Sequence, residues 1–148
     1  GEPKEEMLNV LNYLQPHMPK DRPRYLMGVG KPEDIVEAVR RGVDMFDCVM
    51  PTRNGRNGML FTREGVVNIR NKKWEREFTP IDTWLTPEHT FAYVRHLFVA
   101  GEMLGPMIAS LHNLKFYLWL VREARKHILN NEFHIWKESI LKTINRKL

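Results

Sequence analysis

Apolar residues in the first third of the chain follow two different spacings. Residues 3–14 show helical spacing, a short apolar run occupies 24–27, a second helical pattern extends from Pro32 to Gly42, and a compact apolar run follows at 43–50. A strand, a helix and a second strand joined by short glycine turns form a β-α-β unit with parallel strands. The pattern therefore predicts an α/β fold class.

The middle of the chain predicts a loop followed by a hairpin. Residues 51–58 read Pro-Thr-Arg-Asn-Gly-Arg-Asn-Gly, and the two Asn-Gly pairs favour a sharply turned loop. Apolar runs at 59–62 and 66–69 flank Arg63-Glu64-Gly65. We therefore expect a β-hairpin whose turn has three residues and contains glycine.

Helical periodicity dominates the last part of the chain. After a polar stretch over 70–80, apolar residues recur at helical spacing over 88–104, 114–128 and 133–144, which predicts a helical subdomain. A single pair of parallel strands with one crossover helix makes a poor sheet on its own, because parallel sheets have more strands and are covered on both faces. The chain therefore resembles the closing part of a larger barrel.

Composition is that of a globular protein. Of the 148 residues, 43% are hydrophobic and 28% are charged, which is enough for a packed core. No apolar run approaches the roughly 20 residues that cross a bilayer. Residues 1–6 also lack the layout of a signal peptide, so we expect no membrane partner and a cytoplasmic location. The single cysteine, Cys48, excludes an intrachain disulfide and a zinc site with several cysteines.

Positive charge is moderate overall and concentrated near the middle of the chain. The formal net charge is +5 and the pI is about 9.5. Arg53 and Arg56 lie three residues apart beside two asparagines, and further cations follow over 70–76. Guanidinium and amide groups can bind phosphates and base edges of a nucleic acid, whereas a solvated surface is the plain alternative. The short sequence distance to Asp47 favours a functional interpretation.

Asp47 is the residue whose position in the hydrophobic pattern suggests a catalytic role. It ends an apolar run directly before the basic segment, and reactive groups of parallel α/β folds lie at the carboxyl ends of strands. A carboxylate there suits a nucleophile or a general base. The alternative is an aspartate that accepts backbone N–H bonds and caps the loop. Asp44, earlier in the same run, is interpreted as a turn residue or a residue at the start of the strand.

Two further patterns have both a functional and a structural interpretation. Gly28-Val29-Gly30 precedes a helix, but Glu33 occupies the place of the third glycine of a dinucleotide fingerprint. The glycines would either let a flat ligand approach the backbone or form a tight turn. His89, His96 and His112 lack the spacing of a paired-histidine metal motif and have no neighbouring cysteines, so we expect no metal site.

Several continuous stretches resemble the tRNA-guanine transglycosylases. They surround the motif Phe46-Asp47-Cys48 and lie at 22–30, 42–58, 66–71, 92–98, 100–105 and 112–117. This resemblance is highly specific and covers most of the chain. It identifies the chain as the C-terminal part of such an enzyme, which implies the C-terminal segment of a (β/α)8 TIM barrel with a β-hairpin and a helical subdomain.

The resemblance also implies an activity and roles for single residues. Enzymes of this family exchange the wobble guanine of certain tRNA anticodons for queuine or, in bacteria, for its 7-aminomethyl-7-deazaguanine precursor. Asp47 would attack the ribose C1′ and form a covalent tRNA–enzyme intermediate, which the incoming base resolves. The implied base-pocket residues are Tyr25, Met27 and Gly28, and the implied residues for the anticodon loop are Arg53 and Arg56.

Two features of the family pattern are missing from this chain. The family's zinc motif, Cys-x-Cys-x-x-Cys with a later histidine, falls on Ile81, Thr83, Thr86 and His112. Only His112 remains, so we expect no zinc and no other cofactor. Ile81 and Trp84 are expected to pack this lobe apolarly instead. The family's aspartates for base recognition and proton transfer belong to earlier barrel strands, which have no counterpart here.

These departures determine what we expect of the whole chain. Residues 1–70 correspond to terminal barrel strands, helices and the hairpin, and residues 71–148 to the family's zinc-binding region. Alone, the chain should turn over little or no base, because nucleophile and acid-base groups must converge in one site.

Its expected partners are a tRNA anticodon loop, guanine or a 7-deazaguanine base, and a second copy or a complementary barrel half. The alternatives are a non-catalytic RNA-binding or assembly module with a structural Asp47, and a self-associating scaffold.

Overall fold

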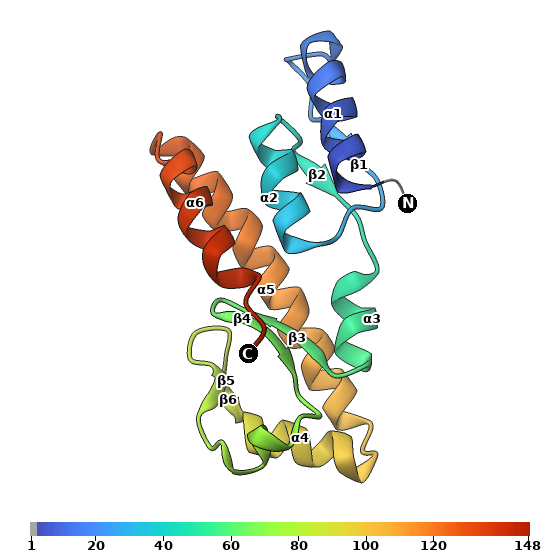
Figure 1. Ribbon diagram of the computed structural model, residues 1–148, viewed down its shortest axis with the longest axis vertical. Helices are drawn as coiled ribbons and strands as arrows, with labels where there is room; N and C mark the ends of the chain where they lie inside the picture. Colours follow the sequence, from blue (N-terminus) through green and yellow to red (C-terminus); the bar gives the residue numbers. More distant parts are fainter. Residues whose placement is uncertain (1–2) are drawn as a thin grey trace. The chain divides into compact units, whose positions relative to one another are not determined.

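The computed structural model describes residues 3–148 and combines helices with short strands (Figure 1). The chain forms two compact units, with the boundary between Val49 and Met50. This mixture of helices and sheets confirms the coarse α/β class. The assignment to a (β/α)8 barrel, and the division after residue 70 that rests on it, stay predictions.

The first unit contains two α-helices and one pair of parallel strands. Its elements are α1 (Lys4–Leu14), the short 3-10 helix η1 (Gln15–His17), β1 (Tyr25–Leu26), α2 (Pro32–Arg40) and β2 (Met45–Phe46). Tyr25 lies opposite Met45 and Leu26 opposite Phe46 in a parallel register. The predicted β-α-β unit is therefore present, although each strand is shorter than the apolar run that predicted it.

Local chemistry explains where α2 begins and how it is held. Pro32 suits the first turn of a helix because no hydrogen bond is needed from its nitrogen, and two acidic residues follow it at the positive end of the helix dipole. One of them, Asp34, pairs with Lys4 of α1 at 2.9 Å. One buried apolar cluster of this unit contains Leu11, Ala38 and Val43.

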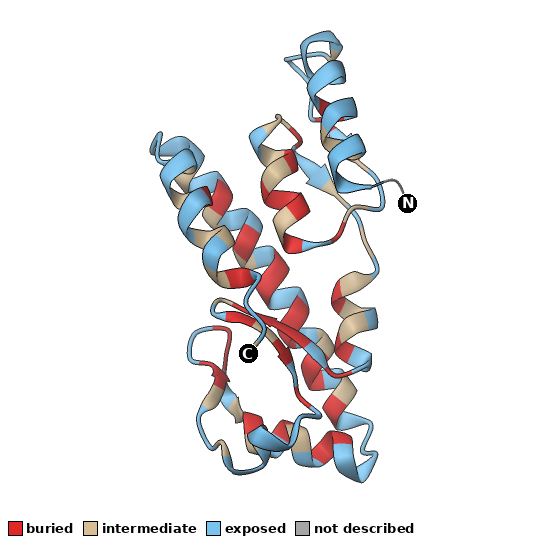
Figure 2. Ribbon diagram, viewed as in Figure 1, coloured by how far each residue is buried: buried red, intermediate tan, exposed pale blue. Residues whose placement is uncertain are grey.

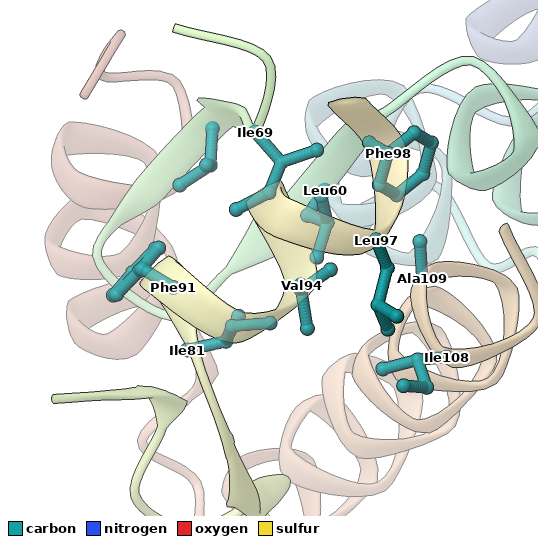
Figure 3. Close-up of a cluster of buried hydrophobic side chains, with 10 residues drawn as sticks. Leu60, Ile69, Ile81, Phe91, Val94, Leu97, Phe98, Ile108 and Ala109 are labelled. Atoms are coloured by element: carbon teal, nitrogen blue, oxygen red, sulfur yellow. The ribbon is translucent and has the colours of Figure 1, made fainter. Parts of the chain in front are cut away.

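The second unit consists of helices and two antiparallel hairpins. Its elements are α3 (Met50–Arg56), β3 (Met59–Thr62), β4 (Gly65–Asn68), the 3-10 helix η2 (Lys72–Arg76), β5 (Pro80–Asp82), β6 (Thr86–Thr90), α4 (Phe91–Ala100), α5 (Leu104–Leu129) and α6 (Phe133–Ile144). β3 pairs with β4, and β5 pairs with β6. Figure 3 shows how side chains from the first hairpin, β5, α4 and α5 converge in one apolar cluster, which includes Leu60, Ile81, Val94, Leu97 and Ile108.

The long helix α5 supports the other elements of the second unit. Its buried positions recur every three or four residues and form one stripe along the helix (Figure 2). The stripe packs against α3, β3 and α4. None of the helices between residues 3 and 148 is long and apolar enough to cross a membrane.

Three details of the predicted layout are wrong. Residues 50–56 form helix α3 instead of an open loop. Thr62 pairs directly with Gly65, so the hairpin turn has two residues and not three. α5 begins at Leu104, ten residues before the predicted start at residue 114, and Pro106 is tolerated because it lies in the first turn.

The helix predicted from residue 88 also begins later than expected. Residues 86–90 form β6, which suits the β-branched Thr86 and Thr90. The Thr90 hydroxyl then accepts a hydrogen bond from the Tyr93 N–H at 3.2 Å and caps α4. The last predicted helix, over 133–144, is confirmed as α6.

Candidate functional site

Asp47 lies at the carboxyl edge of the two parallel strands. It follows β2 directly, and Met27 and Gly28 follow β1. The Tyr25 hydroxyl donates a hydrogen bond of 2.7 Å to Asp47 Oδ1. The backbone N–H of Gly28 donates a hydrogen bond of 3.0 Å to the same oxygen. The structure therefore brings Tyr25, Gly28 and Asp47 into direct contact.

These two donors stabilise the ionised form of the Asp47 carboxyl group. The hydrogen bond from Tyr25, and after it the one from Gly28, lowers the pKa of Asp47 below its ordinary value. The same hydrogen bond raises the pKa of Tyr25. Near neutral pH, Asp47 is therefore an anion and Tyr25 a neutral donor. An oriented, ionised carboxylate can serve as a nucleophile or as a base.

The turn beside Asp47 is open. The Met27 side chain is 73% exposed. Gly28 has a φ of +72°, which side chains rarely adopt, and no described atom lies within 4 Å of a Cβ placed there. Glycine is thus needed for the backbone conformation that aims its N–H at Asp47, and the free space above it can admit a flat ligand.

Asp44 has a structural role in the same strand segment. Its Oδ2 accepts the Arg24 N–H at 2.8 Å, and its own N–H donates to the Arg24 carbonyl at 2.9 Å. The buried Arg24 side chain in turn donates to the carbonyls of Met18 and Pro19, both at 3.2 Å. These contacts confirm the interpretation of Asp44 as a residue at the start of the strand.

Arg53 and Arg56 belong to the second unit and lie on α3. Residues three apart on a helix share a face, and both side chains are exposed. The helix packs closely on α5, because a Cβ at Gly55 would lie only 2.8 Å from Ser110 Cα. A helix held against α5 therefore carries the two guanidinium groups that were predicted on a loop.

Asn113 anchors the start of α3, a role that was not predicted from its position in the sequence. Its buried side chain accepts the Phe61 N–H at 2.9 Å and donates to the carbonyls of Pro51 and Met59, both at 2.9 Å. One amide group thus connects α5, β3 and α3. The signal in the sequence was a polar pair, His112 and Asn113, at core positions of an apolar helix, because buried polar groups need partners.

The positions of the family's zinc motif lie in the second unit. Ile81, Thr86 and His112 are buried and Thr83 is exposed. The Thr86 hydroxyl contacts His112 Nδ1, and His112 Nε2 lies 2.8 Å from the Phe61 carbonyl oxygen. Because a carbonyl can only accept, Nε2 carries the proton and the Nδ1 lone pair accepts the Thr86 hydroxyl.

This set of side chains does not fit a zinc ion. Ile81 offers no ligand, threonine hydroxyls are not zinc ligands of structural sites, and the lone pair of His112 is already engaged. Burial lowers the pKa of His112 to about 4, so its ring is neutral near neutral pH. Across residues 3–148, no group of three or more His, Cys, Asp or Glu side chains is arranged to hold a metal ion. The expected absence of a cofactor stays a prediction for metal analysis to test.

Trp84 does not pack this lobe, and that expectation is wrong. Its side chain is 71% exposed, whereas Ile81 and Leu85 are buried. The carboxylate of Asp82 accepts the N–H groups of Trp84 and Leu85, and this tight turn directs Leu85 inward and Trp84 outward. Among the other histidines, His96 is exposed on α4.

The chain is similar to a known family over nearly its whole length. The family model described as Queuine tRNA-ribosyltransferase matches residues 1–146. A relative of that name from Aquifex aeolicus (strain VF5) is 49% identical over 152 residues, covering 100% of this chain and 40% of the relative. Relatives of the same name from Acinetobacter baylyi and Hydrogenovibrio crunogenus are 55% and 54% identical, covering 90% and 86% of this chain and 36% of each relative. The chain thus spans about two-fifths of the length of these relatives.

Proposed function

The chain belongs to the queuine tRNA-ribosyltransferase family, and we propose that it forms part of a tRNA-guanine transglycosylase with Asp47 as the nucleophile. One observation carries the proposal: the Asp47 carboxylate lies at the carboxyl edge of the parallel strands, held by the Tyr25 hydroxyl and the Gly28 N–H. Catalytic groups of parallel α/β folds lie at this edge.

In the first displacement, Asp47 attacks C1′ of the wobble guanosine. A bond forms between C1′ and a carboxylate oxygen while the glycosidic bond to N9 breaks, and guanine leaves with the bonding electron pair and takes up a proton. Both donors hold Oδ1, so attack through Oδ2 preserves the two hydrogen bonds. The product is a covalent aspartyl-ribose intermediate on the tRNA.

In the second displacement, queuine or its 7-deazaguanine precursor replaces Asp47. The incoming base loses the proton from N9, attacks C1′, and returns the electron pair of the ester bond to the carboxylate. The hydrogen bonds from Tyr25 and Gly28 stabilise the departing carboxylate, consistent with the lowered pKa of Asp47. Proton transfer falls to aspartates of the earlier barrel strands, outside this chain.

Other residues of the chain are assigned to binding of the tRNA. Arg53 and Arg56 present two cations on one face of α3, which suits the phosphates of an anticodon loop. Met27 and the open turn at Gly28 border the base. A base turned out of a loop, with arginines on the neighbouring nucleotides, is a common way to read single-stranded RNA.

The same proposal includes a complementary partner. Among residues 3–49, the parallel sheet of the first unit has two strands. On α5, the exposed apolar residues Met107, Leu111 and Leu118 recur at helical spacing, as expected of a face that packs against another surface. We propose that the chain acts with the rest of a (β/α)8 barrel, in a cytoplasmic enzyme, and turns over little base alone.

Trapping of the covalent intermediate tests the function. The chain is incubated with cognate tRNA, alone and with the N-terminal part of a family relative, and resolved on a denaturing gel. We expect a tRNA adduct only when both parts are present, and none with Asp47→Asn. Asp21→Asn, which removes one exposed carboxylate from the same unit, should leave the adduct unchanged. An equal yield from Asp47→Asn would refute the assignment of the nucleophile.

A non-catalytic RNA-binding or assembly module is the second candidate. It is favoured by the position of Arg53 and Arg56 in a unit with its own core, separate from the unit that contains Asp47. This alternative predicts tRNA binding without any adduct, even with the complementary part present. A self-associating scaffold predicts instead a stable oligomer whose sedimentation is independent of tRNA.

A further inference from the structure

The segment from Ile81 to Thr86 makes a tight turn between β5 and β6, and Asp82 holds that turn. Asp82 is 6% exposed. Its Oδ1 accepts the Trp84 N–H at 2.8 Å and the Leu85 N–H at 2.9 Å. Two backbone donors of the turn are thus satisfied by one buried carboxylate, which fixes the local backbone.

Arg63, from the turn of the β3–β4 hairpin, binds the same carboxylate. Its Nε donates to Asp82 Oδ2 at 3.0 Å, and its Nη2 lies 2.9 Å from Asp82 Oδ1. This two-point contact engages both oxygens of Asp82. The guanidinium carbon also lies 5.9 Å from the centre of the Trp84 ring. Arg63 therefore connects the first hairpin to the 81–86 segment.

Thr86 connects the other end of the segment to the core. Its hydroxyl donates to His112 Nδ1, and His112 donates through Nε2 to the Phe61 carbonyl. Thr86 is 3% exposed and His112 is 0% exposed, so both hydrogen bonds are buried. This short chain of hydrogen bonds joins β6, α5 and β3.

We propose that Arg63, Asp82, Thr86 and His112 form a metal-independent network that holds the 81–86 segment at the place where the family's zinc motif falls. A structural zinc ion would join such a segment to a helix through four ligands. Here an ion pair and hydrogen bonds connect the corresponding parts of the chain. The network concerns the stability of the second unit and does not depend on the chemistry of Asp47.

The arrangement of the network also disfavours a metal ion at its centre. A zinc-bound imidazole uses a nitrogen lone pair, and in His112 that lone pair accepts the Thr86 hydroxyl while the other nitrogen donates to Phe61. The carboxylate of Asp82 is occupied by the Arg63 guanidinium and two backbone N–H groups. A metal would have to displace partners that are already in place.

Metal analysis of the whole 148-residue chain is the first test. The purified protein is incubated with zinc sulfate, dialysed, and measured by plasma mass spectrometry, and its thermal unfolding is followed with and without EDTA. We expect far less than one zinc per chain and an unfolding midpoint that EDTA does not move. Stoichiometric zinc after dialysis, or a midpoint lowered by EDTA, would overturn the proposal.

Substitutions within the network are the second test. Asp82→Asn keeps an oxygen for the turn but loses the ion pair, and Asp82→Ala loses both. We expect the midpoint to fall by about 5 °C for Asp82→Asn and by about 10 °C for Asp82→Ala. Glu88→Gln is the matched control, because it removes the exposed pair with Lys115 at 3.5 Å and should shift the midpoint by less than about 2 °C. Equal midpoints for Asp82→Ala and Glu88→Gln would contradict the network.

Thr86 gives an independent comparison with a local readout. Thr86→Ser keeps the hydroxyl, whereas Thr86→Val keeps the shape and leaves His112 Nδ1 without a donor, so Val should lower the midpoint more than Ser. Hydrogen exchange reports on the turn directly. The Trp84 and Leu85 amides should be protected in the zinc-free protein and exchange at least about tenfold faster in Asp82→Asn. Unprotected amides in the zinc-free wild type would refute the role of Asp82.

Discussion

Asp44 and Asp47 lie three residues apart, yet their carboxylates have different surroundings. Asp44 forms two hydrogen bonds with the backbone of Arg24, and these hold the start of β2 beside the start of β1. Asp47 lies just beyond the end of β2. Its carboxylate accepts hydrogen bonds from the Tyr25 hydroxyl on β1 and from the Gly28 N–H in the turn after β1. The residue at the edge therefore keeps an oriented negative charge at the exposed end of the strand pair.

Tyr25→Phe tests the electrostatic part of this site. Because the Tyr25 hydroxyl is the largest cause of the lowered pKa of Asp47, its removal should raise that pKa towards the ordinary value. The carboxylate would then be lost at a higher pH when the solution is acidified. Carbon NMR titration of the Asp47 carboxyl group measures the change, and Tyr13→Phe is the control on an exposed tyrosine of the same unit. An unchanged midpoint would contradict the role of Tyr25.

Gly28→Ala tests the backbone conformation that supplies the second donor. Gly28 and Gly101 have φ of +72° and +75°, and in both cases no described atom lies within 4 Å of an added Cβ. Alanine at either position should lower the free energy of unfolding by about 1 kcal/mol through backbone strain alone. Only Gly28→Ala should also raise the pKa of Asp47. Urea unfolding and NMR titration of both variants distinguish the two effects, and an identical Asp47 pKa in both would contradict the proposed contact.

His112 predicts a pH dependence of stability. Its folded pKa of about 4 lies below the ordinary 6.5, so between these values the unfolded chain binds a proton that the folded chain does not. The contribution of His112 to the free energy of unfolding is constant above pH 6.5. It falls by about 3 kcal/mol as the pH drops from 6.5 to about 4. His112→Gln should therefore show a shallower pH profile in urea unfolding between pH 7 and 4. His96→Gln, at an exposed histidine, should keep the wild-type profile; parallel profiles for all three proteins would contradict a neutral, buried His112.

At the scale of elements, α3 is the part whose structure most changes the interpretation of the sequence. Gly55 lets its backbone approach α5, and the Asn113 amide binds its first turn. Arg53 and Arg56 are therefore presented by a supported helix. A helical backbone already packed on α5 would lose less conformational freedom on binding a ligand than an open loop would.

Replacing both arginines tests this interpretation. Arg53→Gln with Arg56→Gln should weaken binding of a tRNA anticodon stem-loop and make the dependence of log K on log salt shallower by about 1.5 to 2. Arg125→Gln with Lys126→Gln removes the same charge from the exposed surface of α5 and is the control. Fluorescence titration at several salt concentrations gives both slopes. Equal slopes for the two double variants would mean that α3 contributes only general charge.

Sequence patterns predicted some elements well and others poorly, for physical reasons. The β-α-β unit, the first hairpin and α6 are dictated by local spacing of apolar residues. The segment over 51–58 contains turn-forming residues, but residues 51–56 are helical and pack on α5, and such tertiary support cannot be read from local preference. The ion pair of Arg63 with Asp82 could not be predicted from local sequence, because it joins the turns of two different hairpins.

At the scale of the whole molecule, the proposed nucleophile lies in a chain that matches only part of its relatives. It spans about two-fifths of the length of its relatives. The residues around Asp47 can be predicted from sequence because the family motif includes them, whereas the orientation of the carboxylate by Tyr25 and Gly28 depends on the pairing of β1 with β2. Under the proposed function, base recognition and proton transfer would also need groups from the rest of the barrel.

The most direct measurement is to locate the covalent bond between tRNA and protein. The chain is combined with the N-terminal part of a relative and cognate tRNA, quenched, digested with nuclease and protease, and analysed by tandem mass spectrometry. We predict a ribose-linked nucleotide on the peptide that contains Asp47, with the fragment ions assigning the mass to Asp47 itself. A ribose adduct on any other residue, or an adduct that persists in Asp47→Asn, would contradict the assignment of Asp47 as the nucleophile.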